Sequence, residues 1–145
     1  MHLILGAYRC VHQAGATSAH ARKEHGWQRV QALFEEKGTE ILAASVSISE
    51  FARRLHDLGA TIEEAREATA AYHYVLDEVV AVDSQVAWTA FEMGYQTPNR
   101  LPLIDALIAA AARERGACLV HRDQHMAPIP QHLITQLNLA NEHFS

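Results

Sequence analysis

Three carboxylates occupy the positions of this sequence that best suit chemistry. Glu50 stands in SVSISEF, Asp105 in LPLIDALIAAAARERG and Asp123 in LVHRD. Asp105 is the only polar residue between positions 103 and 112, so a buried carboxylate there needs a positive partner, either a residue from elsewhere in the fold or a metal ion. Clustered carboxylates repel one another unless a cation compensates, and oxygen ligands select hard ions such as Mg²⁺ or Mn²⁺. Together the three acids predict a metal site suited to phosphodiester hydrolysis.

Each acid also has a purely structural explanation. Glu50 follows Ser47 by three residues, a capping-box spacing, and taken alone this explanation is the better one. Asp105 could be a first-turn acid that complements a helix dipole, although its apolar surroundings favour a functional role. Asp123 fits a turn after a strand equally well.

The apolar pattern predicts the elements that would carry these acids. Strands are expected over residues 2–8, 40–46, 78–83 and 117–120, with a further short strand over 133–139. Helices are expected over residues 16–37, 47–59, 84–94 and 102–116, and one more opens with a capping box at 61–64. Continuously apolar strands that alternate with helices indicate an α/β fold of three layers, with a mostly parallel sheet of four to five strands flanked by helices. Such sheets bind ligands at the carboxyl ends of their strands, where these acids fall.

Composition narrows the class of protein further. The 145 residues fit a single domain over 1–145, and the net charge of −5 argues against a broad basic surface for nucleic acid. No apolar run is long enough to cross a bilayer, and the N-terminus has no signal-peptide pattern. Cys10 and Cys118 are expected to be two buried thiols, which favours a cytoplasmic protein. The ten histidines are scattered, so no zinc site is predicted.

With these motifs the sequence resembles the PIN-domain family, in particular the VapC-type toxins of bacterial toxin–antitoxin pairs. The resemblance is strongest in LPLIDALIAAAARERGACLVHRDQHMAPIP, an Asp-bearing alanine-rich helix followed by a glycine, a strand and a second Asp. SVSISEF is similar to the family's strand and acid-bearing helix. The resemblance implies a Mg²⁺- or Mn²⁺-dependent ribonuclease in which Glu50, Asp105 and Asp123 bind the metal and act in catalysis. It also implies a homodimer, an RNA substrate and a cognate antitoxin that covers the active site and contacts arginines such as Arg53 and Arg54.

One position departs from the family pattern. The family ends its first strand with an Asp, where this sequence reads Gly6-Ala7-Tyr8. The resemblance therefore implies an impaired metal site, with Gly6 in place of a ligand. Arg100 and Arg122 are the further residues expected to contact RNA or phosphate, and His121 is either a phosphate contact or a strand residue packed on a neighbour.

Three functions remain open at this level. The first is an endoribonuclease toxin, and the second is a PIN fold that has lost catalysis and still binds antitoxin or RNA. The third is an unrelated α/β module, such as a receiver-like signalling domain, and it ranks last. A module of that kind requires an acidic pair at its first strand and a lysine near its last strand, and the sequence has neither.

Overall fold

The computed structural model describes residues 4–6, 10–12 and 40–141, together with positions 28, 31, 32, 35 and 38; side chains are described over 40–140 and at those five positions. The strands are β1 (Ile4–Gly6), β2 (Cys10–His12), β3 (Glu40–Ala44), β4 (Glu78–Val80), β5 (Cys118–His121) and β6 (Thr135–Asn138). The helices are α3 (Ser45–Asp57), α4 (Ile62–Val75), α5 (Ser84–Gln96) and α6 (Leu103–Glu114), with a 3-10 turn η1 at Leu139–Asn141. The helix expected over 16–37 falls mostly outside the described residues.

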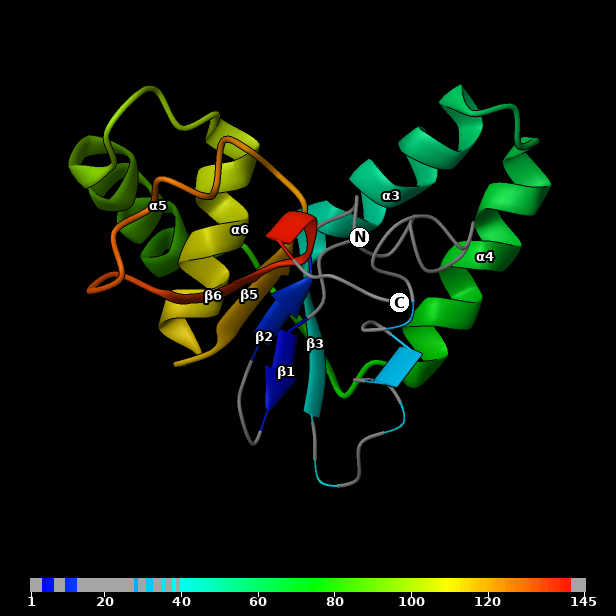
Figure 1. Cartoon of the computed structure of the whole chain (residues 1–145). Helices are drawn as coiled ribbons and strands as arrows, with labels where there is room; N and C mark the ends of the chain where they lie inside the picture. The colour runs from blue at the N-terminus through cyan, green and yellow to red at the C-terminus, as the bar shows by residue number, and fades with distance from the viewer. Residues whose placement is uncertain are drawn as a thin grey trace.

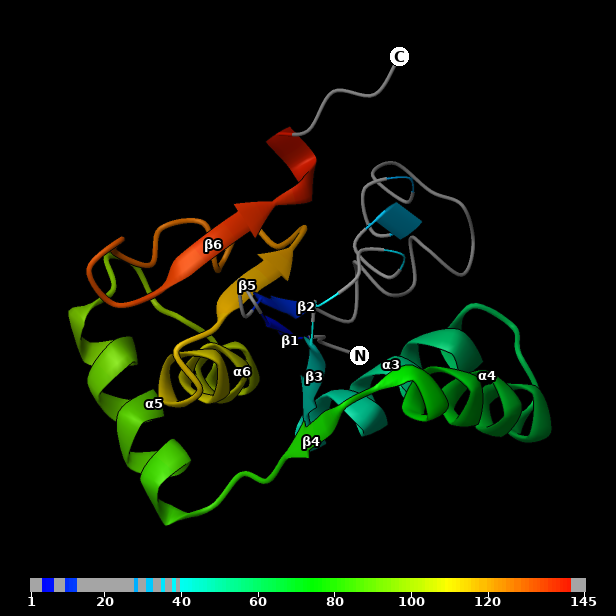
Figure 2. The same cartoon turned by 90° about the horizontal axis from the view of Figure 1, so that it is seen from below.

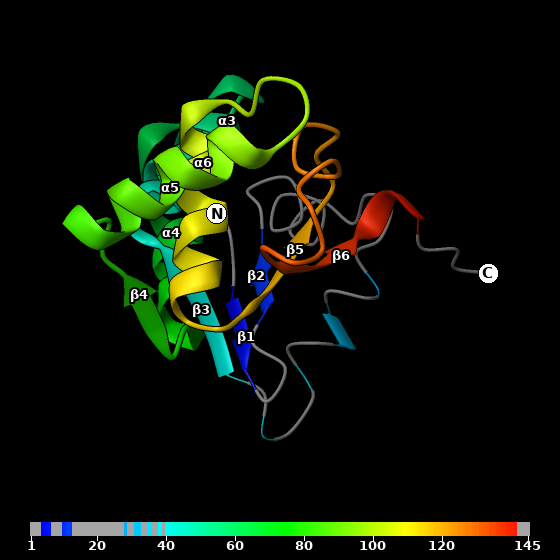
Figure 3. The ribbon, with the colours of Figure 1, turned by 90° about the vertical axis from the view of Figure 1, so that its left-hand side faces the viewer.

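The strands form one sheet in which parallel pairings dominate. β3 pairs with β4, β2 with β5 and β5 with β6 in parallel, whereas β1 runs antiparallel to both β3 and β5. The sheet order is β2-β5-β1-β3-β4, with β6 added beside β5 (Figure 3). The α/β prediction is confirmed. The described part of the sheet has six strands rather than four or five, because the N-terminal segment contributes both β1 and β2.

Two hydrophobic clusters cover the two faces of the sheet. Leu42 and Ala44 of β3 belong to a cluster with α5, α6 and the segment after β5, whereas Ile41 and Ala43 belong to a cluster with α3 and α4. This alternation is the two-residue period of a strand with both faces buried. Figures 1 and 2 show the same division, with the α5–α6 pair and the α3–α4 pair on opposite sides of the strands. The three-layer arrangement follows from this packing.

Local signals in the sequence explain where the helices begin and end. The capping box at α4 is present as predicted, because the Thr61 hydroxyl accepts from the Glu64 N–H while the Glu64 carboxylate accepts from the Thr61 N–H. α6 ends at Glu114, and Gly116, whose φ of 59° lies in the left-handed region, follows its C-cap Arg115. None of the helices over the described residues combines the length and the apolar character that a membrane span requires.

The cysteine prediction is wrong. Cys118 is disulfide-bonded, and the register of β2 and β5 sets it opposite Cys10, the other cysteine of the chain. The Cα atoms of directly opposed residues on neighbouring strands lie within the range that a disulfide spans. The apolar segments that form β2 and β5 are far apart in the sequence, and their pattern does not predict that they pair in this register. Cytoplasmic localisation stays a prediction and no longer has free thiols as support.

Candidate metal centre

The sheet topology brings the carboxyl ends of β3 and β5 to one edge. Both strands are antiparallel to β1, so they run in the same direction. Asp123 follows the end of β5 by two residues, and Glu50 lies in the second turn of α3, which begins directly after β3. Asp105 lies in the first turn of α6. The three predicted carboxylates therefore come from three separate elements at the edge where open α/β sheets bind their ligands.

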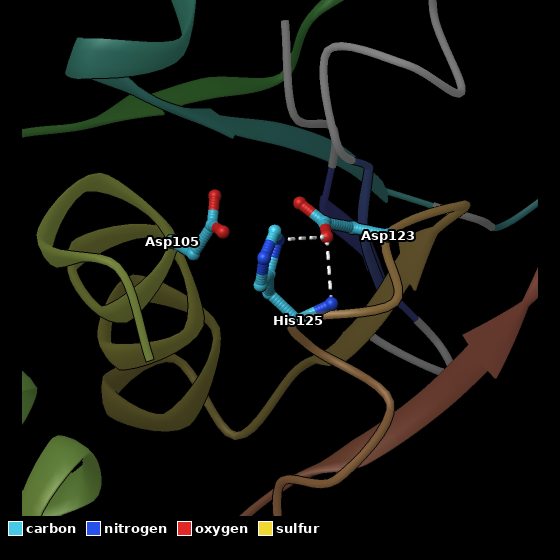
Figure 4. Close-up of side chains that lie close together, drawn as sticks. All are labelled: Asp105, Asp123 and His125. Carbon is cyan, nitrogen blue, oxygen red and sulfur yellow. Dashed lines mark hydrogen bonds and ion pairs between the residues drawn. The ribbon is translucent and has the colours of Figure 1, made fainter. Parts of the chain in front are cut away.

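Asp105 and Asp123 meet there, together with His125. One ligand atom from each residue lies within 4.8 Å of the others (Figure 4). Asp105 is only 8% exposed. The His125 backbone N–H donates to Asp123 Oδ1 at 2.8 Å, and the His125 ring Nδ1 lies 3.1 Å from the same oxygen. Two carboxylates and an imidazole thus point toward a common position from α6 and from the segment after β5.

The electrostatics of Asp105 are those of a buried acid beside other acids. Burial, then the charge and hydrogen bond of Asp123, then the charge of Glu50 raise the pKa of Asp105 from 3.8 to about 7, while His125 opposes the rise. The expected positive partner for Asp105 is therefore only partly supplied by His125. The carboxylates of the site repel one another, and a bound cation would offset this repulsion.

Glu50 lies outside the group of three and still belongs to their electrostatic environment. Burial, the first cause, and the charge of Asp123 raise the pKa of Glu50, whereas the charge of Arg54 lowers it. The capping-box explanation for Glu50 is wrong, because α3 begins at Ser45, its N-cap Ala44 has no side-chain cap, and Ser47 is fully buried. No helix-capping role therefore accounts for this half-buried acid.

A buried hydrogen-bond relay fixes the segment that carries Asp123. The Asp123 N–H donates to His121 Nδ1 at 3.1 Å, and His121 Nε2 lies 2.6 Å from Gln136 Oε1 on β6. Because Nδ1 accepts, Nε2 carries the ring proton and donates to Gln136. The Gln136 amide donates in turn to the carbonyls of Ile129 and Ala127. His121 is completely buried, burial lowers its pKa, and a neutral ring is what this relay requires.

His121 therefore serves as a strand residue packed on a neighbour, which was one of its two expected roles. Of the arginines, Arg100, Arg53 and Arg54 are exposed and Arg122 is half-buried. Whether Arg100 and Arg122 contact a substrate stays a prediction.

The backbone register corrects the expectation for Gly6. Gly6 is paired with Glu40, the first residue of β3, so it lies at the edge of the sheet opposite to Asp123. The N-terminal strand that runs toward the site is β2, whose last residue His12 is paired with Val120. Gly6 therefore does not stand where a fourth carboxylate would join the cluster. The apolar pattern of a short strand does not indicate the direction in which the strand runs. The sequence alone therefore could not place Gly6 at the correct edge of the sheet.

Two residues of the site were not predicted from the sequence. His125 does have a signal in the sequence, because His121 and His125 are four residues apart, one on each side of Asp123 in HRDQH. That spacing signals a metal site when both rings lie on one helix face. Here the segment leaves a strand, and the two rings separate, one into the core and one into the site. Gln136 has no comparable signal, because its role depends on the pairing of β5 with β6.

The residues present fit a divalent cation. The separation of 3.1 Å between His125 Nδ1 and Asp123 Oδ1 matches the distance of about 3 Å between adjacent ligands on a six-coordinate ion with bonds of about 2.1 Å. Clustered acids with raised pKa values also need a cation to be fully ionised at neutral pH. The fold and the site thus define an α/β domain with an acidic cluster that could hold a metal ion, at the carboxyl edge of its sheet.

Comparison with known proteins assigns the family. A model of the PIN domain family matches residues 14–130, well over half of the sequence, and the chain belongs to this family. The match begins after β2, so Gly6 lies outside it. The fold is similar to that of a chain in the crystal structure of VapBC2 from Rickettsia felis bound to a DNA fragment from their promoter. That likeness has a TM-score of 0.65 at 16% identity and covers 85% of this chain and 92% of the other. No curated protein matches the sequence.

Proposed function

We propose that this PIN-domain protein is a VapC-type toxin, an endoribonuclease that hydrolyses RNA phosphodiesters with a carboxylate-bound Mg²⁺ or Mn²⁺ ion. The observation that carries the proposal is the meeting of Asp105 and Asp123 at the carboxyl edge of the sheet, with Glu50 close enough to perturb Asp105. Membership of the PIN family supports nuclease chemistry. The likeness to a chain of a VapBC2 complex supports an antitoxin partner, and we infer a homodimer by the same resemblance.

In this proposal Asp105 and Asp123 hold the ion, and Glu50 completes the acidic set from α3. A divalent ion held there would supply a bound water of lowered pKa and positive charge against the phosphate oxygens. The His121–Gln136 relay holds the backbone N–H of Asp123 and so fixes the segment that carries its carboxylate. Arg122, directly before Asp123, and Arg100, before α6, would contact the RNA backbone.

A degenerate PIN fold that binds antitoxin or RNA without cleaving is the second candidate. It is favoured by the register of Gly6, because within the described residues α3, α6 and the segment after β5 each supply one carboxylate and β1 supplies none. Among the residues that the structure describes, any impairment would then come from having three acids rather than four at the site, and not from Gly6 itself.

RNA cleavage separates the two candidates. The chain, an Asp105→Asn variant and a Glu67→Gln control would be incubated with structured RNA and Mn²⁺, with and without EDTA. Glu67 is an exposed acid on α4, so its variant makes the same charge change away from the site. The proposal predicts cleavage by the chain and the control, none by Asp105→Asn, and none with EDTA. Cleavage that persists in Asp105→Asn would refute it, and inactivity of all three with intact Mn²⁺ binding would favour the binding module.

A further inference from the structure

We propose that His125 is a direct nitrogen ligand of the metal centre and that it makes the site selective for Mn²⁺ over Mg²⁺. The inference rests on the metal centre proposed above and adds a residue that the three carboxylates do not include. It identifies the resident ion by the chemistry of its ligands.

The position of His125 is the first support. A ring nitrogen of His125 and carboxylate oxygens of Asp105 and Asp123 all lie within 4.8 Å of one another, whereas Glu50 is outside this group. The three side chains point toward one another in Figure 4. By distance, His125 is therefore better placed than Glu50 to share an ion with the two aspartates.

The attachment of His125 is the second support. Its backbone N–H donates to the carboxylate of Asp123, so the turn that orients Asp123 also fixes the backbone of His125. The His121–Gln136 relay holds the same segment from the other side. The ring itself is about half exposed, at 51%, so it can rotate to share an ion without disturbing the core.

Ligand chemistry then gives the selectivity. Imidazole is a poor ligand for Mg²⁺, which prefers oxygen and keeps several of its waters, and it suits borderline transition ions. Two carboxylates and one imidazole therefore favour Mn²⁺ over Mg²⁺ by comparison with a site of carboxylates alone. The alternative role for His125 is to pair with Asp123 only while no metal is bound.

Metal binding by calorimetry, with pulsed electron paramagnetic resonance of bound Mn²⁺, tests the inference. The variants are His125→Ala and, as a control, His73→Ala, an exposed histidine on α4. We expect His125→Ala to lose Mn²⁺ affinity by about tenfold or more. Its Mg²⁺ affinity should stay within about threefold, because water replaces the ring at little cost on Mg²⁺. The bound Mn²⁺ should show nitrogen coupling in the original protein and in His73→Ala, and none in His125→Ala.

Several outcomes would overturn the inference. Nitrogen coupling that is absent from the original protein, or that survives in His125→Ala, shows that the ring is not a ligand. Unchanged or increased Mn²⁺ affinity in His125→Ala means that the ring pairs with Asp123 only in the metal-free protein. These results leave the carboxylate centre standing, whereas Mn²⁺ binding that survives in Asp105→Asn refutes the proposed centre itself. Matching melting temperatures of the two histidine variants would show that folding is not the cause.

Discussion

Replacing Asp105 by asparagine is expected to stabilise the metal-free protein at pH 8 and to remove its stabilisation by Mn²⁺. The pKa of this carboxyl rises from 3.8 to about 7 on folding, first because of burial and then because of Asp123. Between these values the folded state binds more protons than the unfolded state, so its stability falls as pH rises and the loss is complete above pH 7. Asparagine keeps the shape of the carboxyl and carries no charge.

The magnitude follows from the size of the shift. Each pKa unit corresponds to about 1.36 kcal/mol, so the full rise sets an upper bound of about 4 kcal/mol. Solvent reaches the half-exposed His125 beside Asp123 and screens part of the repulsion, so we expect about 2 kcal/mol. For a domain of this size that is about 4–8 °C in melting temperature. At pH 5 the folded wild-type carboxyl is protonated and the unfolded one is ionised, so over a third of the difference, about 0.8 kcal/mol, should remain.

Thermal unfolding at pH 5 and pH 8, with and without Mn²⁺, measures both effects. At a Mn²⁺ concentration of 100 times Kd the wild type should gain about 2.7 kcal/mol, and the variant should gain nothing. Glu67→Gln, the exposed control on α4, should behave as the wild type throughout. Equal melting temperatures of wild type and Asp105→Asn at pH 8 would show that ionising the buried carboxyl does not destabilise the fold. A full Mn²⁺ gain in the variant would show that Asp105 holds no metal.

Three further variants test other parts of the structure. Gly6→Asp should leave Mn²⁺ affinity by calorimetry unchanged, because Gly6 pairs with Glu40 at the opposite edge; a clear gain would refute the register of β1. Gln136→Leu leaves the buried His121 Nε2–H without its acceptor, which should cost about 1–3 kcal/mol in urea unfolding and weaken Mn²⁺ binding by about tenfold. A Gln136→Leu protein that binds Mn²⁺ normally would show that the relay does not position Asp123. Thr61→Ala removes the α4 cap and should cost about 1 kcal/mol in urea with Mn²⁺ affinity intact; a loss of affinity would contradict the separation of α4 from the site.

The sequence predicted those parts of the fold that depend on local pattern. The strands β3, β4 and β5 and the helices α3 to α6 appear within a few residues of their expected bounds, because each has a clear apolar period and clear end signals. The burial of Asp105 was likewise evident from its apolar neighbours. Its proximity to Asp123 was predictable once both were assigned to one edge of a parallel sheet.

The missed features depend on contacts between distant segments. The antiparallel direction of β1 and the pairing of Cys10 with Cys118 are set by sheet register, which short apolar strands do not encode. The role of Gln136 exists only because β6 lies beside β5. Ser47 had the spacing of a capping box and is instead buried inside α3, since the strand before it ends two residues earlier than expected.

The proposed function depends on a divalent ion held by Asp105 and Asp123 at the carboxyl edge of the sheet. Anomalous diffraction from crystals grown with Mn²⁺ tests it most directly, because the metal is located without reference to activity. We predict an anomalous peak bonded to carboxylate oxygens of both residues, and no such peak in crystals of Asp105→Asn. A peak bonded to neither aspartate, or no peak at Mn²⁺ concentrations that saturate binding in solution, would contradict it.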